Sequence, residues 1–181
     1  MKNSFAQITI LSICLLVSAS AAHACDTILE FSAQKLRSEE TVNFCEKFSG
    51  KPLLVVNTAS KCGYTPQFEE LEELHKRYAG KLNIVGFPSD DFSQEHADEE
   101  AISKVCFINY GVTFTMLEPS SVRGDTANNL FKALAETTGE QPAWNFTKYL
   151  IGANGQDVTH FESKVKPLSP TVLNAVEAAL E

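Results

Sequence analysis

Apolar runs and amphipathic segments alternate along the chain from residue 53 onward and predict the order of its strands and helices. The apolar run over 53–56, which contains two β-branched residues, predicts a buried strand. Apolar residues then recur at helical spacing over 68–78, and Thr65 followed by Pro66 predicts an N-cap with proline at the first helical position. A second strand is expected over 82–87, so this region predicts a βαβ unit with parallel strands and a right-handed crossover.

The later part of the chain continues the alternation. The expected segments are helices over 101–110, 128–137 and 170–180, and strands over 112–117, 144–151 and 157–161. Asn154-Gly155 is a strong hairpin signal between the last two strands, whereas the region before residue 53 is polar and offers only 28–31 as a candidate short strand. The order β-α-β-α-β-α-β-β-α fits an α/β thioredoxin-like fold, with a central mixed β-sheet flanked by helices.

The first 24 residues differ from the rest in their pattern. Lys2 gives a positive start, the stretch 8–17 is a short apolar core, and Ala22-His23-Ala24 fits a small-x-small cleavage site. These features predict a cleaved secretory signal peptide over 1–24 and a single domain over 25–181, in the periplasm or otherwise exported.

Charge and histidine spacing narrow the range of functions. The 181-residue chain has a formal net charge of −8 and a pI near 5.0. Because such a surface repels polyanions, neither nucleic-acid binding nor stable contact with an anionic membrane is expected. His75, His96 and His160 are scattered singly, so no metal or other cofactor is expected.

Export would place the cysteines in an oxidising compartment, where they pair unless they are kept apart or actively reduced. Four cysteines follow the signal segment, at positions 25, 45, 62 and 106, and they allow three complete pairings. Their order favours Cys25–Cys45 as a local structural disulfide and leaves Cys62 and Cys106 for another purpose.

Cys62 is the candidate reactive residue, because it lies where a predicted strand ends and a predicted helix begins. Unpaired backbone N–H groups and the positive end of a helix favour the thiolate over the thiol. Lys61 adds a neighbouring positive charge. The competing interpretation is an inert buried thiol, which the polar turn argues against.

Four segments around these residues resemble the glutathione peroxidase family in its cysteine-containing form. The segment 57–67 resembles the family's active-site segment, and 86–92, 109–114 and 144–150 have the same appearance and order. The resemblance covers roughly residues 50 to 165. It implies a hydroperoxide reductase with a thioredoxin-like fold, in which Cys62 attacks the peroxide and becomes a sulfenic acid.

The resemblance also implies polar donors around Cys62. Trp144 and Asn145 match two of them, although Trp144 could also be an ordinary core aromatic residue. The third donor is a glutamine in a Phe-Pro-Cys-Asn-Gln-Phe pattern, at whose place this chain has Asp91. An ionised carboxylate cannot donate a hydrogen bond, so Asp91 is protonated, turned away or bonded to the loop.

Cys106 matches the place of a resolving cysteine in the family members that use thioredoxin. It would attack the sulfenic acid and form a disulfide with Cys62, which a thioredoxin-like protein then reduces. The competing interpretation is a small core residue on the apolar side of a helix, with glutathione as the reductant. The short link over 138–143 favours a monomer by comparison with oligomeric family members.

Two other functions of the same fold fit the sequence less well. A thioredoxin-like thiol–disulfide oxidoreductase would have a second cysteine three residues after the first, where this chain has Thr65. A copper-binding module of the same fold would need two nearby cysteines and a distant histidine, and the cysteine pair is missing. A thiol peroxidase therefore fits the sequence best.

Overall fold

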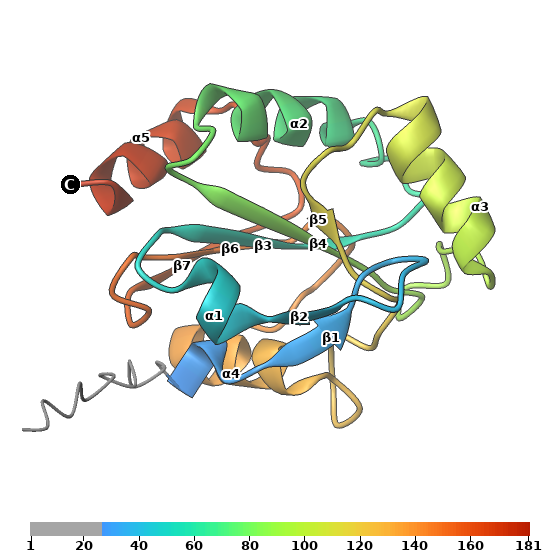
Figure 1. Cartoon of the computed structure of the whole chain (residues 1–181), viewed down its shortest axis with the longest axis horizontal. Coiled ribbons are helices and arrows are strands. Elements are labelled where there is room, and N and C mark those ends of the chain that lie inside the picture. Colours follow the sequence, from blue (N-terminus) through green and yellow to red (C-terminus); the bar gives the residue numbers. More distant parts are fainter. Residues whose placement is uncertain (1–26) are drawn as a thin grey trace, which may run out of the picture.

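A five-stranded mixed sheet forms the centre of the protein, in a computed structural model that describes residues 27–181 (Figure 1). The strand order is β5-β4-β3-β6-β7. β3 pairs in parallel with β4 and β4 with β5, whereas β6 lies antiparallel to both β3 and β7. The strands are β3 Leu53–Thr58, β4 Asn83–Pro88, β5 Thr115–Met116, β6 Lys148–Ile151 and β7 Val158–Phe161. The predicted mixed sheet, parallel βαβ unit and late hairpin are confirmed.

Helices cover both faces of this sheet (Figure 1). α2 (Gln67–Arg77) and α5 (Pro170–Ala179) lie on one face. α4 (Asn129–Thr138) lies on the other face, together with the N-terminal elements. The expected signal peptide and Cys25 lie outside the described residues, so both stay predictions.

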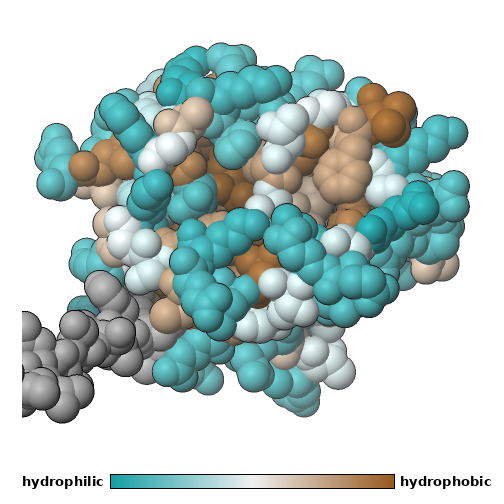
Figure 2. Space-filling model, viewed as in Figure 1, coloured by the Kyte–Doolittle hydropathy of each residue, from teal (hydrophilic) through white to brown (hydrophobic). Residues whose placement is uncertain are grey.

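The central strand β3 separates two apolar layers. Leu54 and Val56 belong to the layer under α2 and α5, whereas Leu53 and Val55 belong to the layer under α4. Every residue of β3 is buried, as expected for a strand covered on both faces. On the face shown in Figure 2, hydrophilic residues dominate and hydrophobic ones appear in small separate areas. None of the described helices is long and apolar enough to cross a membrane.

The N-terminal region is more regular than its sequence suggests, and the strand expected over 28–31 is wrong. It contains a 3₁₀ turn, a two-stranded hairpin and a short helix: η1 Thr27–Leu29, β1 Ser32–Gln34, β2 Thr41–Asn43 and α1 Phe44–Phe48. Ile28 and Leu29 both bury their side chains in the layer under α4. Consecutive buried residues suit a tight turn better than a strand, in which neighbouring side chains point to opposite faces.

The helix expected over 101–110 is present, but it consists of an α-helical part followed by a π-helical part. Asp98 caps it by accepting from Ala101 N–H at 2.8 Å, so α3 spans Glu99–Ser103. It continues into a π-helical segment, η2 (Lys104–Asn109), in which Val105 O accepts from Tyr110 N–H five residues later. Such π turns are rare in proteins, and those that occur are often found at functional sites.

Two expected strands are shorter than predicted, because backbone groups at their ends bind elsewhere. Thr113 N–H, in the first of them, donates to the Glu72 carboxylate at 2.7 Å, so β5 begins only at Thr115. Phe146 has a φ of 64°, a left-handed conformation that interrupts extended structure, so β6 begins at Lys148.

Gly86 in β4 provides a test of the packing between β4 and β5. A Cβ atom there would collide with Sδ of Met116 and lie 2.8 Å from its Cε. We expect Gly86→Ala to lower the free energy of unfolding by about 1–3 kcal/mol, measured by urea denaturation, because overpacking strains a filled core. Gly63→Ala is the matched control: its Cβ would meet nothing within 4 Å, so a change within about 0.5 kcal/mol is expected. Equal losses in both variants would contradict this account.

Candidate active site

Cys62 lies in the turn that joins β3 to α2, called the Cys62 turn below (residues 59–66). Its thiol is free, its side chain is 7% exposed, and Sγ accepts a hydrogen bond from Tyr64 N–H at 3.4 Å. Because α2 begins at Gln67, the nearest donor to the sulfur is an amide of the turn and not the first turn of the helix. The turn therefore directs one backbone N–H at the sulfur.

Thr65 fixes the shape of this turn, and its predicted role as a helix N-cap is wrong. Pro66 occupies the N-cap position, with no side-chain cap. The Thr65 hydroxyl instead accepts from Cys62 N–H at 3.0 Å and donates to the carbonyl oxygen of Ala59 or Cys62, each 2.8 Å away. One buried hydroxyl therefore satisfies the N–H group of Cys62 and one of these two carbonyl groups.

The Cys62 turn is also fastened to the loop after β4, called the Gln94 loop (residues 89–98). Ser60 N–H donates to Glu95 Oε1 at 3.1 Å, and Lys61 N–H donates to Gln94 O at 2.9 Å. Lys61 Nζ donates to Glu95 O at 3.1 Å, so its charge is held at the junction of the two loops. The two residues that precede Cys62 thus have fixed partners.

Asn145 reaches the same junction from the other side of β3. It is fully buried, and its Nδ2 donates to Gln94 Oε1 at 3.0 Å. Its Oδ1 is buried without a hydrogen-bond partner among the described residues. Asn145 and Gln94 therefore place a pair of side-chain amides beside the backbone that leads into Cys62.

Sequence reasoning missed Gln94. The structure brings its side chain to Asn145 and its backbone carbonyl group to Lys61. One signal was available, since Gln94 is the only glutamine in its loop. Its spacing from Phe92 differs from the pattern that pointed to Asp91.

The side chain of Asp91 binds a different part of the chain, the segment 121–123. Its carboxylate accepts from Val122 N–H at 2.6 Å and Arg123 N–H at 3.2 Å, and from the Ser121 hydroxyl at 3.0 and 3.1 Å. The Asp91 carboxylate is therefore hydrogen-bonded, but to the segment 121–123 and not to its own loop. The carboxylate orders that segment and offers no donor to Cys62.

Trp144 is a surface aromatic residue rather than a core one. Its side chain is 42% exposed, and its ring packs against Phe92 with 5.2 Å between centroids. Together with Tyr64 it lines a hollow of about 330 Å³, next to the residue whose amide contacts Cys62 Sγ. The structure thus brings Trp144 to the rim of the site.

The turn that carries Trp144 and Asn145 (residues 144–147) is held by Asn57 at the end of β3. Asn57 Nδ2 donates to Trp144 O at 3.2 Å, and Asn57 Oδ1 accepts from Thr147 N–H at 3.0 Å. The Asn57 backbone carbonyl accepts from Phe146 N–H at 2.7 Å. These bonds support the left-handed backbone of Phe146 noted above.

Lys148 also stabilises this turn, through a hydrogen bond to Phe146 O. Its side chain is fully buried, and Nζ donates to Phe146 O and Val165 O at 2.7 Å and to Ser163 O at 3.3 Å. Burial lowers the pKa of this ammonium group to about 7. With three carbonyl acceptors, all three of its N–H donors have partners.

Cys106 is the second free thiol, and its side chain is only 1% exposed. It lies in η2 and belongs to the same apolar layer as Cys62. Burial, and secondarily the charge of Glu95, raises the pKa of this thiol to about 12. In this conformation Cys106 is an unreactive thiol in the core.

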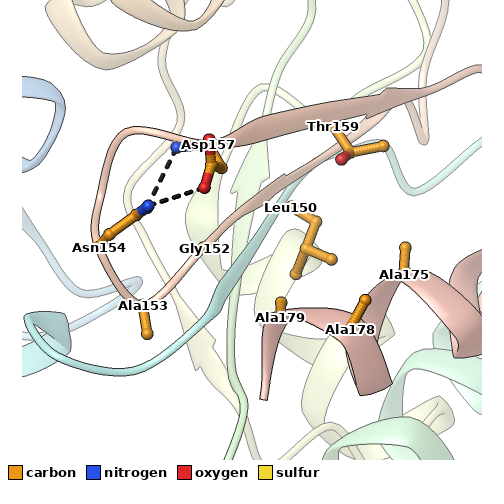
Figure 3. Close-up of a pocket in the computed structure, with 9 residues that line it drawn as sticks. All are labelled: Leu150, Gly152, Ala153, Asn154, Asp157, Thr159, Ala175, Ala178 and Ala179. Atoms are coloured by element: carbon orange, nitrogen blue, oxygen red, sulfur yellow. Dashed lines mark hydrogen bonds between the residues drawn. The ribbon is translucent and has the colours of Figure 1, made fainter. Parts of the chain in front are cut away.

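Another hollow lies at the opposite end of the sheet, between the β6–β7 hairpin and α5 (Figure 3). It is lined mainly by small side chains, and its one carboxylate, on Asp157, accepts from Asn154 Nδ2 at 2.7 Å. It contains no thiol and therefore offers no comparable chemistry. Within residues 27–181, no group of three or more histidine, cysteine or carboxylate side chains is placed to hold a metal ion.

Comparison with known proteins gives consistent matches. The sequence model described as glutathione peroxidase matches residues 28–135. A protein of Lactococcus lactis subsp. cremoris named glutathione peroxidase is 44% identical over 144 residues, which cover 76% of this chain and 90% of that protein. The Saccharomyces cerevisiae protein named glutathione peroxidase-like peroxiredoxin 2 is 42% identical over 131 residues, 68% of this chain and 81% of its own. The crystal structure of Trgpx in apo form superposes with a TM-score of 0.67 at 29% identity, covering 86% and 95% of the two chains.

The role assigned to Thr65 can be tested by removing its hydroxyl group. We expect Thr65→Val to lower the free energy of unfolding by about 1–3 kcal/mol, measured by urea denaturation, because the buried Cys62 N–H loses its partner. Thr65→Ser keeps the hydroxyl and should retain most of the stability. If the valine and serine variants were equally stable, the hydroxyl would not be what holds the Cys62 turn.

Proposed function

The chain belongs to the glutathione peroxidase family and is a peroxidase, and we propose that it reduces hydroperoxides through the thiol of Cys62. One observation carries the proposal. A free thiol that accepts a backbone N–H lies in a turn fastened to the Gln94 loop, where the half-buried amide of Gln94 meets the buried amide of Asn145. The thioredoxin-like fold brings these groups together from three separate segments.

The first step of the proposed reaction is attack by the Cys62 thiolate on the outer oxygen of the hydroperoxide. An S–O bond forms as the O–O bond breaks, so the sulfur is oxidised and the peroxide is reduced. The leaving alkoxide or hydroxide takes up the proton that the thiol released. The products are the Cys62 sulfenic acid and an alcohol, or water when the substrate is hydrogen peroxide.

The neighbouring polar groups have distinct proposed roles. The amides of Gln94 and Asn145 and the indole N–H of Trp144 can donate to a thiolate or a departing oxygen without competing as nucleophiles. Gln94 takes the place first expected for Asp91. Its Oε1 accepts from Asn145, which leaves its own N–H groups as donors.

The second proposed step uses Cys106. Its thiolate attacks the sulfur of the sulfenic acid, an S–S bond forms, and the hydroxide that leaves takes up the Cys106 proton as water. The buried thiol must first come out of the apolar layer. The next two residues of η2 are already at the surface, since Phe107 is 37% and Ile108 is 75% exposed. A local unwinding of this short π segment would therefore expose little besides Cys106 itself.

A disulfide intermediate calls for a dithiol, so we propose a thioredoxin-like protein as the reductant. Glutathione would be the reductant of a cycle that uses Cys62 alone. We also propose that the protein is exported after removal of residues 1–24, acts as a monomer and carries a Cys25–Cys45 disulfide. Each of these proposals rests on the sequence features described above.

Two single substitutions test the roles of the cysteines. Cys62→Ser should abolish peroxide consumption, because a hydroxyl group cannot take up the peroxide oxygen. Cys106→Ser should still form the sulfenic acid, measured by dimedone labelling and mass spectrometry, but no Cys62–Cys106 disulfide by peptide mapping under non-reducing conditions.

The outcomes separate the alternatives. Unchanged peroxide consumption in Cys62→Ser would remove the proposed function. A Cys106→Ser variant that turns over at the wild-type rate with a thioredoxin system would show instead that Cys106 is a core residue.

The pH dependence of disulfide formation tests whether Cys106 reacts from its buried position. There its pKa is raised, so its thiolate fraction would grow about tenfold per pH unit up to a pH of about 12. Once unwound, the thiol would titrate near its ordinary value of about 8.5. We therefore expect the single-turnover rate to rise with pH and level off near pH 9. Trp144, the only tryptophan of the chain, offers a fluorescence signal for this measurement.

The control for this experiment is Cys106→Ser, in which any pH dependence of the first step belongs to Cys62. A wild-type rate that kept rising tenfold per unit beyond pH 10 would indicate attack from the buried position.

A further inference from the structure

The orientation of the Trp144 indole depends on packing. Its backbone carbonyl group accepts from Asn57, but the indole N–H has no hydrogen-bond partner within residues 27–181. The ring is 42% exposed and packs against Phe92, with 5.2 Å between centroids and 51° between the ring planes. An aromatic pair at this distance and tilt is favourable. The position of Phe92 therefore helps to set the direction in which the indole N–H points.

Phe92 in turn contacts Arg123. The guanidinium carbon Cζ of Arg123 lies over the Phe92 ring, 5.1 Å from its centroid, which is within the range of a cation–π contact. Arg123 forms no ion pair with a carboxylate of the described residues, so its charge is not engaged by a nearer partner of that kind. Although Phe92 belongs to an irregular loop, its side chain is only 9% exposed.

Asp91 fixes the place of Arg123. Its carboxylate oxygen Oδ2 accepts from Val122 N–H at 2.6 Å and from Arg123 N–H at 3.2 Å. The Ser121 hydroxyl group donates to the same carboxylate. Hydrogen bonds to an ionised acceptor are among the stronger ones in proteins. The backbone from which the Arg123 side chain extends is therefore held by the residue that precedes Phe92.

Residues 121–124 are also bound to the chain that leads into Trp144. Gly124 N–H donates to Gln141 Oε1 at 3.1 Å, and Gln141 lies three residues before Trp144. The segment thus has contacts with the Gln94 loop through Asp91 and with the approach to Trp144 through Gln141. This arrangement connects the backbones on which the two aromatic rings are carried.

We infer from these contacts that Asp91 and Arg123 are positioning residues for the Trp144 indole. Asp91 fixes the backbone of Arg123, the guanidinium group holds the Phe92 ring, and that ring limits the orientations of the indole. The inference rests on the proposed function, in which the indole N–H donates to the thiolate or to the departing oxygen. Such a donor is most effective when it is already aimed before the charge develops. Asp91, whose carboxylate offers no donor to Cys62, serves the site in this indirect way.

Fluorescence tests the positioning without any turnover, because Trp144 is the only tryptophan of the chain. Arg123→Met keeps an unbranched side chain and removes the charge. We expect the indole to move more freely in this variant, so that quenching by acrylamide rises and the emission anisotropy falls. Arg77→Met is the matched control, because Arg77 is also exposed but pairs with Glu73 on α2. It should leave both signals unchanged.

Two substitutions of Asp91 test the next step. Asp91→Ala should have the same effects as Arg123→Met, because Val122 N–H and Arg123 N–H lose their acceptor. Asp91→Asn is the conservative variant: its side-chain oxygen can take the place of Oδ2, and its Nδ2 can donate to the Ser121 hydroxyl oxygen. It should retain most of the wild-type behaviour. Asp157→Ala removes a loop carboxylate at the far end of the sheet (Figure 3) and should have no effect.

The rate constant for oxidation of Cys62 by hydrogen peroxide tests whether this position matters for the reaction. Quenched flow, alkylation of the remaining thiol and mass spectrometry give this constant without a reductant. We expect Arg123→Met to lower it about two- to fivefold, the fold-change that corresponds to an exposed cation–π contact. Asp91→Ala should lower it at least as much. In a Trp144→Phe background, which has no indole N–H, neither substitution should lower it further, because effects that pass through one group are not additive.

The outcomes separate failure of the inference from failure of the proposed function. Losses of rate that persist in the Trp144→Phe background would overturn the inference, and so would wild-type fluorescence in both Arg123→Met and Asp91→Ala. A wild-type protein that consumed no peroxide would overturn the function, whereas the fluorescence of the variants would still decide whether the indole is fixed in this way. If Asp91→Ala folds poorly by urea denaturation, Arg123→Met carries the test, since Arg123 is exposed.

Discussion

The side chain of Asn57 connects the two parts of the site, and the arrangement of the other groups depends on it. Its side-chain amide binds the turn that carries Trp144 and Asn145: Nδ2 donates one hydrogen bond to this turn and Oδ1 accepts another from it. The same strand leads directly into the Cys62 turn. One fully buried residue therefore sets the position of Cys62 relative to the turn that carries Asn145. The left-handed backbone of Phe146 is tolerated because Asn57 and Lys148 bind the groups on either side of it.

A second constraint is the fastening of the Gln94 loop to the backbone before Cys62. The Gln94 backbone carbonyl accepts from Lys61 N–H, and its side-chain oxygen accepts from Asn145 Nδ2. Gln94 therefore contacts both the Cys62 turn and the turn that carries Asn145. The Glu95 carboxylate accepts a hydrogen bond from Ser60 N–H. Burial raises the pKa of that carboxyl group. The loop has no regular structure of its own, and its order comes from these bonds. Supporting hydrogen bonds of this kind fix the positions of side chains that an irregular loop would otherwise leave free.

The sequence predicted what depends on periodicity and missed what depends on contacts between distant segments. Alternation of apolar runs and helical spacing located the strands and helices of the sheet, because burial on both faces imposes those patterns. Cys62, Cys106 and Asn145 were found from local context and resemblance. Thr65 was misassigned because its hydroxyl can cap a helix or close a turn, and only the position of Ala59 decides between them. The role of Asp91 stayed open and Gln94 was missed, because the path of an irregular loop is set by partners such as Val122 that lie far along the chain.

The second cysteine combines an unreactive environment with a place in a short segment whose next two residues lie at the surface. A thiol held at a high pKa is protected from oxidation by the same burial that prevents it from attacking Cys62. The fold limits any movement to a short length of chain, since Asp98 caps α3 before η2 and Glu72 binds Thr113 after it. Between these two anchors, a π segment with poor helical geometry carries Cys106 inward and Ile108 outward. In the proposed cycle, formation of the sulfenic acid at Cys62 would therefore select the unwound state of this segment alone, while the sheet and the amides around Cys62 stay in place.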